Sequence, residues 1–168
     1  MQQVIKAIDY MNKIIGIILA LMLAVMSILI IVQIFTRFVI NYPLHWTEEL
    51  ARYLMIYSVF FGAALALRNN RLIAIEALAQ SMSESKQRIL RIFVMLVSII
   101  FFVILLVQGL EIIEVVKPQH SAGLGISMSI PYAAIPIGAG LMIVNSIAVI
   151  LESLKKPHPK TLLESEEL

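Results

Sequence analysis

The sequence has 168 residues, of which 60% are hydrophobic and only 14% are charged. Soluble domains average about 45–50% apolar and roughly 25% charged residues, and a chain this short has too little interior to bury the excess of apolar surface. The net charge of +2 and the lack of cysteine exclude a nucleic-acid-binding domain, a disulfide scaffold and thiolate chemistry. The composition therefore predicts an all-α integral membrane protein.

Four apolar segments approach the length that crosses a bilayer, because a core of about 30 Å needs roughly 20 helical residues. The uncharged runs are 14–36, 92–110 and 131–151, but the second run, 53–67, has only 15 residues. The second helix therefore reaches spanning length only if it starts near Trp46 and carries charged residues in its first turns. We predict a single membrane domain over residues 1–168, with four transmembrane helices at about 14–36, 46–67, 90–112 and 131–151.

The distribution of basic residues predicts how the chain is oriented. Ten of the 13 Lys and Arg residues fall in the N-terminal segment, between the second and third spans, and in the C-terminal tail. Short loops rich in Lys and Arg stay on the cytoplasmic side. Both termini are therefore predicted to be cytoplasmic.

Two segments outside the spans have amphipathic patterns. Apolar residues recur at helical spacing over about 72–82, which predicts a short interfacial amphipathic helix. Residues 1–13 fit either a second interfacial helix or a continuation of the first span. A further helix is expected from Glu84 to about Val116, a length of roughly 50 Å, and Pro118 closes it.

The spans carry little chemistry of their own. No Asp, Glu, Lys or Arg lies in the middle of a span, although transport pathways usually need such groups or unwound helices at mid-depth. The histidines all lie outside the spans, which argues against axial haem ligands, and hydrolytic motifs are absent. We expect no enzyme activity, cofactor or metal site. Asn145 and Ser146, the deepest polar pair, are expected to hydrogen-bond between helices.

Small residues recur at four-residue spacing in three spans, and such faces let helices approach closely in lipid. They are Gly16, Ala20 and Ala24 in the first span, Ser58, Gly62 and Ala66 in the second, and Ala134 and Gly138 in the fourth. Whether these faces meet each other or another protein stays open. Pro131 and Pro136 predict a kink or a late start of the fourth helix, because proline cannot donate to the carbonyl four residues earlier.

The segment that leads into the second span is the most distinctive. Trp46 suits the water–lipid interface, Thr47 is placed to cap the helix, and Glu48 and Glu49 are predicted in its first turn. Glu48 and Arg52 are four residues apart and can pair along one face. These residues fit either a capped helix with a self-neutralising ion pair or a contact point for a partner.

Two motifs carry a family resemblance that covers roughly residues 10–155. The first is Trp46-Thr47-Glu48-Glu49-Leu50-Ala51-Arg52, followed by Gly62-Ala63 and Arg68; the second is Ile130-Pro131-Tyr132 with Ile135-Pro136-Ile137-Gly138 and Leu141-Met142. Both are similar to motifs of the small membrane subunit of tripartite ATP-independent periplasmic (TRAP) transporters.

The resemblance implies a scaffold subunit in a bacterial inner membrane. In this family a large membrane subunit holds the sodium and substrate sites and moves as an elevator, and a periplasmic binding protein delivers an organic acid such as a sialic acid or a C4-dicarboxylate. The small subunit would support the large one and help dock the binding protein, with phospholipids filling gaps. The candidate partner or structural residues are Trp46, Glu48, Glu49, Arg52, Ser58, Gly62, Ala66, Pro131, Pro136 and Gly138.

Two other classes remain open on the residues alone. An autonomous small carrier or channel, working as an oligomer, needs a polar pathway that only Gln33, Asn145 and Ser146 could line. A membrane anchor of a respiratory enzyme is the third class. Neither class accounts for the tryptophan–acid–acid–arginine motif.

Overall fold

The computed structural model describes residues 2–42, 44–69 and 84–155, and within these ranges the chain is helical without a β-strand. The helices are α1 (Gln2–Phe38), α2 (His45–Arg68), α4 (Glu84–Val116), α5 (Ser129–Tyr132) and α6 (Ala134–Lys155). Four segments are long and apolar enough to cross a membrane, the fourth combining α5 and α6. The expected four-helix membrane fold is confirmed, while the interfacial helix predicted at about 72–82 lies outside the described residues.

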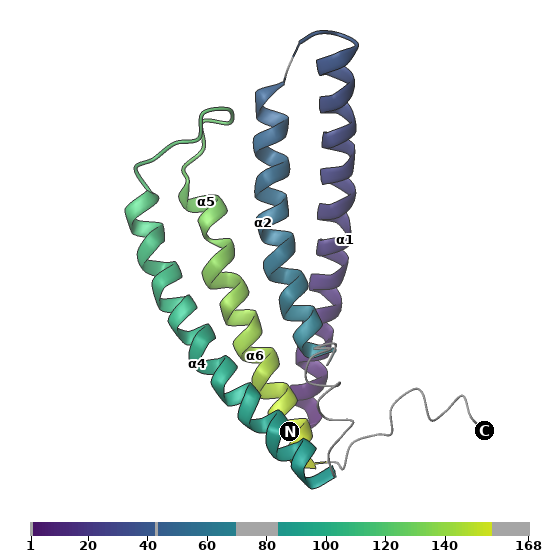
Figure 1. Ribbon diagram of the computed structural model, residues 1–168, viewed down its shortest axis with the longest axis vertical. Helices are drawn as coiled ribbons and strands as arrows, with labels where there is room; N and C mark the ends of the chain where they lie inside the picture. Colours follow the sequence, from purple (N-terminus) through teal and green to yellow (C-terminus); the bar gives the residue numbers. More distant parts are fainter. Residues whose placement is uncertain (1, 43, 70–83, 156–168) are drawn as a thin grey trace, which may run out of the picture.

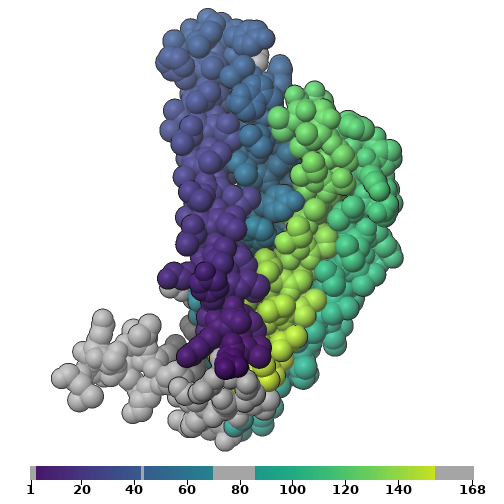
Figure 2. Space-filling model, turned by 180° about the vertical axis from the view of Figure 1, so that it is seen from behind, coloured from purple at the N-terminus to yellow at the C-terminus, as the bar shows by residue number. Residues whose placement is uncertain are grey.

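The helices form an open row in the order α1, α2, α6, α4 (Figure 1). Each helix packs against its neighbour in the row, α1 also reaches α6, and no described residue of α1 contacts α4. Viewed from behind, α1 and α4 again lie at opposite edges (Figure 2). We call the end where α1 begins and α6 finishes the terminal end, and the end with the connections 39–44 and 117–128 the loop end (Figure 1).

The hydrophobic core lies between α2, α6 and α4. Its buried residues are Ala64, Leu67, Met95, Met142 and Val149. Half of the residues in the most apolar window of the fourth span are buried, against 6% in the corresponding windows of α1 and α4. Both α2 and α6 have neighbours on two sides of the row, but the window in α2 is only 17% buried, so α6 is the central helix of the fold.

Close packing around α6 depends on glycines. A Cβ atom on Gly138 would lie 2.5 Å from Cβ of Phe60 in α2, and one on Gly109 would lie 2.9 Å from Cδ of Pro136. Both distances are far below ordinary carbon–carbon contact, so a larger residue at either position would push two helices apart. The small residue predicted at Gly138 therefore serves packing within the chain, and Gly109 does the same on α4.

The fourth span is interrupted near its start, as its prolines predict. The short helix α5 ends at Tyr132, Ala133 follows, and α6 begins at Ala134. Pro136 has no N–H to give to the Tyr132 carbonyl, so the regular hydrogen-bond ladder stops there. Pro131 is buried in α5.

The observed bounds of α1, α4 and α2 test three further predictions. α1 is one continuous helix from Gln2, so residues 2–13 continue the first span rather than form a separate helix. The predicted helix from Glu84 to Val116 is confirmed as α4. The capping role predicted for Thr47 is wrong: α2 already begins at His45, and the buried Thr47 hydroxyl donates to the Leu44 carbonyl at 2.7 Å.

Candidate functional site

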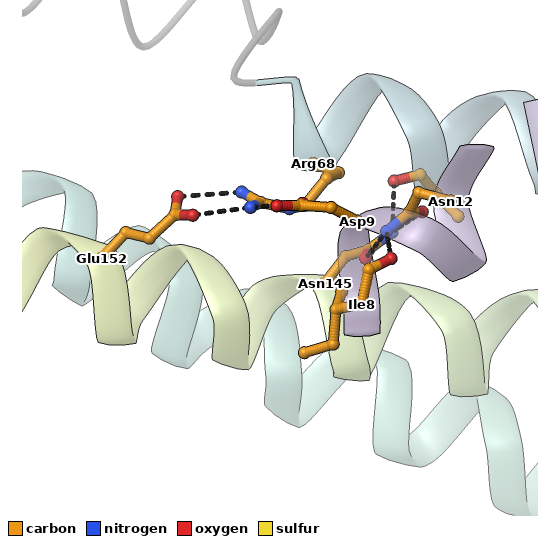
Figure 3. A network of polar contacts seen from close by, with 7 residues as sticks. Ile8, Asp9, Asn12, Arg68, Asn145 and Glu152 are labelled. Carbon is orange, nitrogen blue, oxygen red and sulfur yellow. Dashed lines mark hydrogen bonds and ion pairs between the residues drawn. The ribbon is translucent and has the colours of Figure 1, made fainter. Parts of the chain in front are cut away.

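An arginine at the terminal end joins three helices. The Arg68 guanidinium, at the end of α2, contacts Asp9 of α1 at 2.7 Å and Glu152 of α6 at 2.6 Å (Figure 3). Its contact with Glu152 is bidentate, because two nitrogens bond the two carboxylate oxygens at 2.8 and 2.6 Å. The Arg68 side chain is only 11% exposed. We call Asp9, Arg68 and Glu152 the terminal clasp.

A buried amide pair lies next to the terminal clasp (Figure 3). Asn12 of α1 and Asn145 of α6 exchange two hydrogen bonds, of 2.7 and 2.9 Å, and Asn145 also donates to the Ala64 carbonyl of α2 at 2.8 Å. The interhelical role predicted for Asn145 is confirmed. Ser146 differs from the expectation, because its hydroxyl donates to the Met142 carbonyl within α6.

The Glu49 carboxylate near the loop end binds the backbone of the connection 117–128 rather than another helix. One oxygen of Glu49 accepts hydrogen bonds from the backbone N–H groups of Gly123 (2.8 Å) and Leu124 (2.9 Å), and the other accepts from the Tyr53 hydroxyl. A Cβ atom on Gly123 would lie 2.6 Å from that carboxylate, so a larger residue there would displace the Glu49 side chain. We call Glu49 with residues 123–124 the loop latch.

The connection that the loop latch holds is itself tightly folded. Ser121 N–H donates to the Ile126 carbonyl at 2.8 Å, Met128 N–H donates to the Gln119 carbonyl at 2.9 Å, and Gly125 adopts a φ of 68°. This left-handed conformation favours glycine. The Tyr57 hydroxyl adds a second tie, because it donates to the Ile130 carbonyl of α5 at 2.7 Å.

The predicted pair between Glu48 and Arg52 is present, with 3.1 Å between the charged atoms, and both side chains are exposed. Gln33 of α1 approaches Glu48 at 3.5 Å. Beside them is a shallow hollow of about 300 Å³ between the ends of α1 and α2, lined by Gln33, Arg37, Leu44, His45 and Glu48. The hollow is open to the outside and brings charges of both signs to the loop end.

The remaining predicted residues are not gathered into one site. Trp46 is largely exposed at the loop end, whereas Ser58 is buried with no hydrogen-bond partner for its hydroxyl. The Gly62 position faces Leu19 of α1 at an ordinary distance of 3.9 Å, and Ala66 is half-buried one turn further on. Among the residues that the structure describes, no three His, Asp or Glu side chains lie close enough to hold a metal ion.

The terminal clasp was not among the candidate residues from the sequence. Arg68 and Glu152 directly follow the uncharged runs of their helices, and Asp9 lies five residues before the run 14–36. The alternating direction of the spans places these three ends at the same membrane face. The sequence could therefore have predicted that these three charges lie at the same membrane face. Which of them form ion pairs depends on the order of helices in the row.

Comparison with known proteins agrees with this architecture. Residues 26–156 match the family model described as tripartite ATP-independent periplasmic transporters, DctQ component. A putative TRAP transporter small permease protein of Haemophilus influenzae is 34% identical over 82 residues, which cover 49% of this chain and 51% of that protein. The sialic acid TRAP transporter small permease protein SiaQ of Vibrio cholerae is 26% identical over 151 residues, covering 89% and 85%.

A longer relative is also similar. The sialic acid TRAP transporter permease protein SiaT of Haemophilus influenzae is 32% identical over 127 residues, or 76% of this chain but only 20% of that protein. The aligned region thus spans about half of the first relative and a fifth of SiaT. Because the family model covers most of its sequence, this multi-pass inner-membrane protein belongs to the DctQ-component family, the small permease subunits of TRAP transporters.

Proposed function

We propose that this chain is the static scaffold of a sodium-coupled TRAP transporter, supporting a large elevator subunit and helping to dock a periplasmic binding protein. The observation that carries the proposal is the open row of helices. Its described ion pairs lie at the helix ends, and the buried amides of Asn12 and Asn145 hydrogen-bond each other. A row without an enclosed polar pathway suits support of another polypeptide better than conduction.

The transported solute in this proposal is an organic acid, with a sialic acid or a C4-dicarboxylate as the first candidates. The names of SiaQ and SiaT support the sialic acid. In SiaT the matching region belongs to a much longer polypeptide, which supports a large permease subunit as the direct partner. Phospholipids would fill the gaps along the edges of the row.

The proposed orientation places both termini in the cytoplasm, because the terminal end carries the excess of basic residues. The loop end then faces the periplasm. There Trp46 and Glu48, together with the connection held by the loop latch, form the surface offered to the binding protein. A cysteine placed at Tyr42 should react with an impermeant maleimide from outside intact cells, and one at Lys6 should not; the reverse pattern contradicts this orientation.

Reconstitution tests the scaffold role against the autonomous carrier. Proteoliposomes with this chain alone are expected to take up no sialic acid or dicarboxylate under an inward sodium gradient. Vesicles that also contain the large subunit and receive the binding protein outside should take up the solute. Uptake by the chain alone would establish the carrier instead, and unchanged uptake after omission of this chain would remove the scaffold role.

A further inference from the structure

α2 presents a stripe of side chains that its neighbours in the row leave uncovered. Along it lie Arg52 (side chain 61% exposed), Met55 (51%), Val59 (62%) and the exposed Ala63. These positions are three or four residues apart and therefore share one face of the helix. We call these four residues the α2 stripe.

The uncharged run of α2 that carries the α2 stripe is shorter than the hydrocarbon core of a bilayer. Arg52 and Arg68 are separated by 15 uncharged residues, and 16 helical steps place them about 24 Å apart along the axis. The terminal clasp fixes Arg68 beside carboxylates of α1 and α6 at one end of the row. If that end marks one boundary of a hydrocarbon core of about 30 Å, Arg52 lies about 6 Å inside the other boundary.

The two edge helices present a different surface. Their uncharged runs have 23 residues in α1 and 19 in α4, against 15 in α2. Their exposed side chains are bulky and apolar, as at Ile31 (67% exposed) and Ile100 (64%). Such faces match the hydrocarbon core in length and chemistry. Among these three helices, only α2 has an uncharged run that is clearly shorter than the core.

Arg52 also has hydrogen-bonding capacity that the described part of the chain does not use. One guanidinium nitrogen donates to Glu48 at 3.1 Å, whereas a guanidinium carries five N–H donors. A charge at this depth is costly when it faces lipid. A hydrophobic stretch shorter than the core is accommodated by thinning of the bilayer, by snorkelling or by association with another helix.

We propose that the α2 stripe is the surface on which a transmembrane helix of the large permease subunit packs, with a hydrogen-bond acceptor of that helix beside Arg52. This assignment rests on the scaffold function proposed above. The partner helix would exclude lipid from the short apolar run and satisfy the remaining Arg52 donors. Ala63 offers little side chain at the clasp end of the stripe, so the partner backbone can approach closely there.

Site-specific photocrosslinking in the co-expressed complex tests the assignment. Benzoylphenylalanine replaces Met55 or Val59 in the α2 stripe, and Ile31 or Ile100 serves as the matched exposed position on an edge helix. After irradiation, the large subunit is purified through its tag and probed for this chain. Covalent adducts are expected from positions 55 and 59, in several-fold higher yield than from 31 and 100.

The possible outcomes distinguish failure of the α2 stripe as the interface from failure of the scaffold function. An intact complex with no adduct from either 55 or 59 overturns the α2 stripe as the interface and leaves the scaffold function standing. Failure of the unmodified chain to co-purify with the large subunit overturns both.

A second variant pair tests the acceptor beside Arg52. Arg52→Leu is expected to lower co-purification several-fold at equal membrane expression, while Arg52→Lys, which keeps the charge and three N–H donors, retains most of it. Wild-type recovery of the Arg52→Leu chain contradicts the proposed acceptor.

Discussion

The two ends of α2 are fixed by opposite arrangements of charge. At the terminal end, the Arg68 cation lies on α2 and the carboxylates come from α1 and α6. At the loop end, the carboxylate of Glu49 lies on α2 and its partners include backbone N–H groups of a connection. The first arrangement depends on side chains of three helices, the second on the path of a loop. Substitution of the arginine or of a carboxylate should therefore break the terminal clasp. The loop latch should break only when Glu49 is replaced or when a larger residue at Gly123 displaces its carboxylate.

The largest effect is expected for Arg68→Met. This change leaves Asp9 and Glu152 without their cation at the helix junction, and unfolding in detergent should become easier by about 2 kcal/mol, less than for a fully buried pair because both carboxylates are partly exposed. Denaturation of the purified chain followed by far-UV circular dichroism measures the change. Arg68→Lys should recover part of the loss, and equal stability of Arg68→Met and wild type would show that the terminal clasp contributes nothing.

The amide pair beside the clasp should couple by a smaller amount. A double-mutant cycle of Asn12→Ala and Asn145→Ala is expected to give an interaction energy of about 1 kcal/mol, in the range measured for hydrogen bonds between membrane helices. The sum of the two single losses should exceed the loss in the double variant, because either change removes the same reciprocal bonds. Strict additivity would contradict the pairing.

The loop latch should respond locally. Glu49→Ala removes the acceptor of the Gly123 and Leu124 N–H groups, so hydrogen–deuterium exchange of residues 117–128 should accelerate several-fold while exchange in the core of α6 stays the same. Gly123→Ala is expected to have a similar effect, because its Cβ would collide with the carboxylate. Unchanged exchange in both variants would mean that the connection keeps its shape without the loop latch.

The smallest effect is expected one residue away. Glu48→Ala removes an exposed ion pair with Arg52 and a long contact with Gln33 at 3.5 Å, and exposed ion pairs contribute roughly 0–1 kcal/mol. Stability and exchange in residues 117–128 should stay close to wild type. A loss as large as that of Glu49→Ala would show that the two adjacent carboxylates act together rather than separately.

Much of the fold follows from local patterns in the sequence. The bounds of α4 agree with the prediction from Glu84 to Val116, and the interruption before α6 follows from Pro136. These features depend on residues within one or two turns. The second span was expected to start near Trp46, and α2 begins at His45. The cap was mispredicted because Thr47 is a good capping residue by type, yet the N-cap position is Leu44, three residues earlier, and the Thr47 hydroxyl donates to the Leu44 carbonyl.

The site was harder to predict because its contacts join distant parts of the chain. Glu49 and Gly123 are 74 positions apart, and Arg68 and Glu152 are 84 apart. The residue types show that Glu49 or Arg68 needs a partner, but only the order of helices in the row decides which partner is near. Glu48 and Arg52, four positions apart on one helix, were predicted because the helix alone brings them together.

The open row also has a consequence for the order in which the fold is completed. The main hydrophobic cluster draws only on α2, α4 and α6. Asn12 of α1 hydrogen-bonds Asn145 of α6, whereas Asp9 of α1 is linked to Glu152 of α6 only through Arg68 of α2. Along this chain α1 is synthesised before α6, so the hydrogen bonds between Asn12 and Asn145 cannot form until α6 is in the bilayer. α1 therefore completes its polar contacts only after the helices that follow it have been inserted.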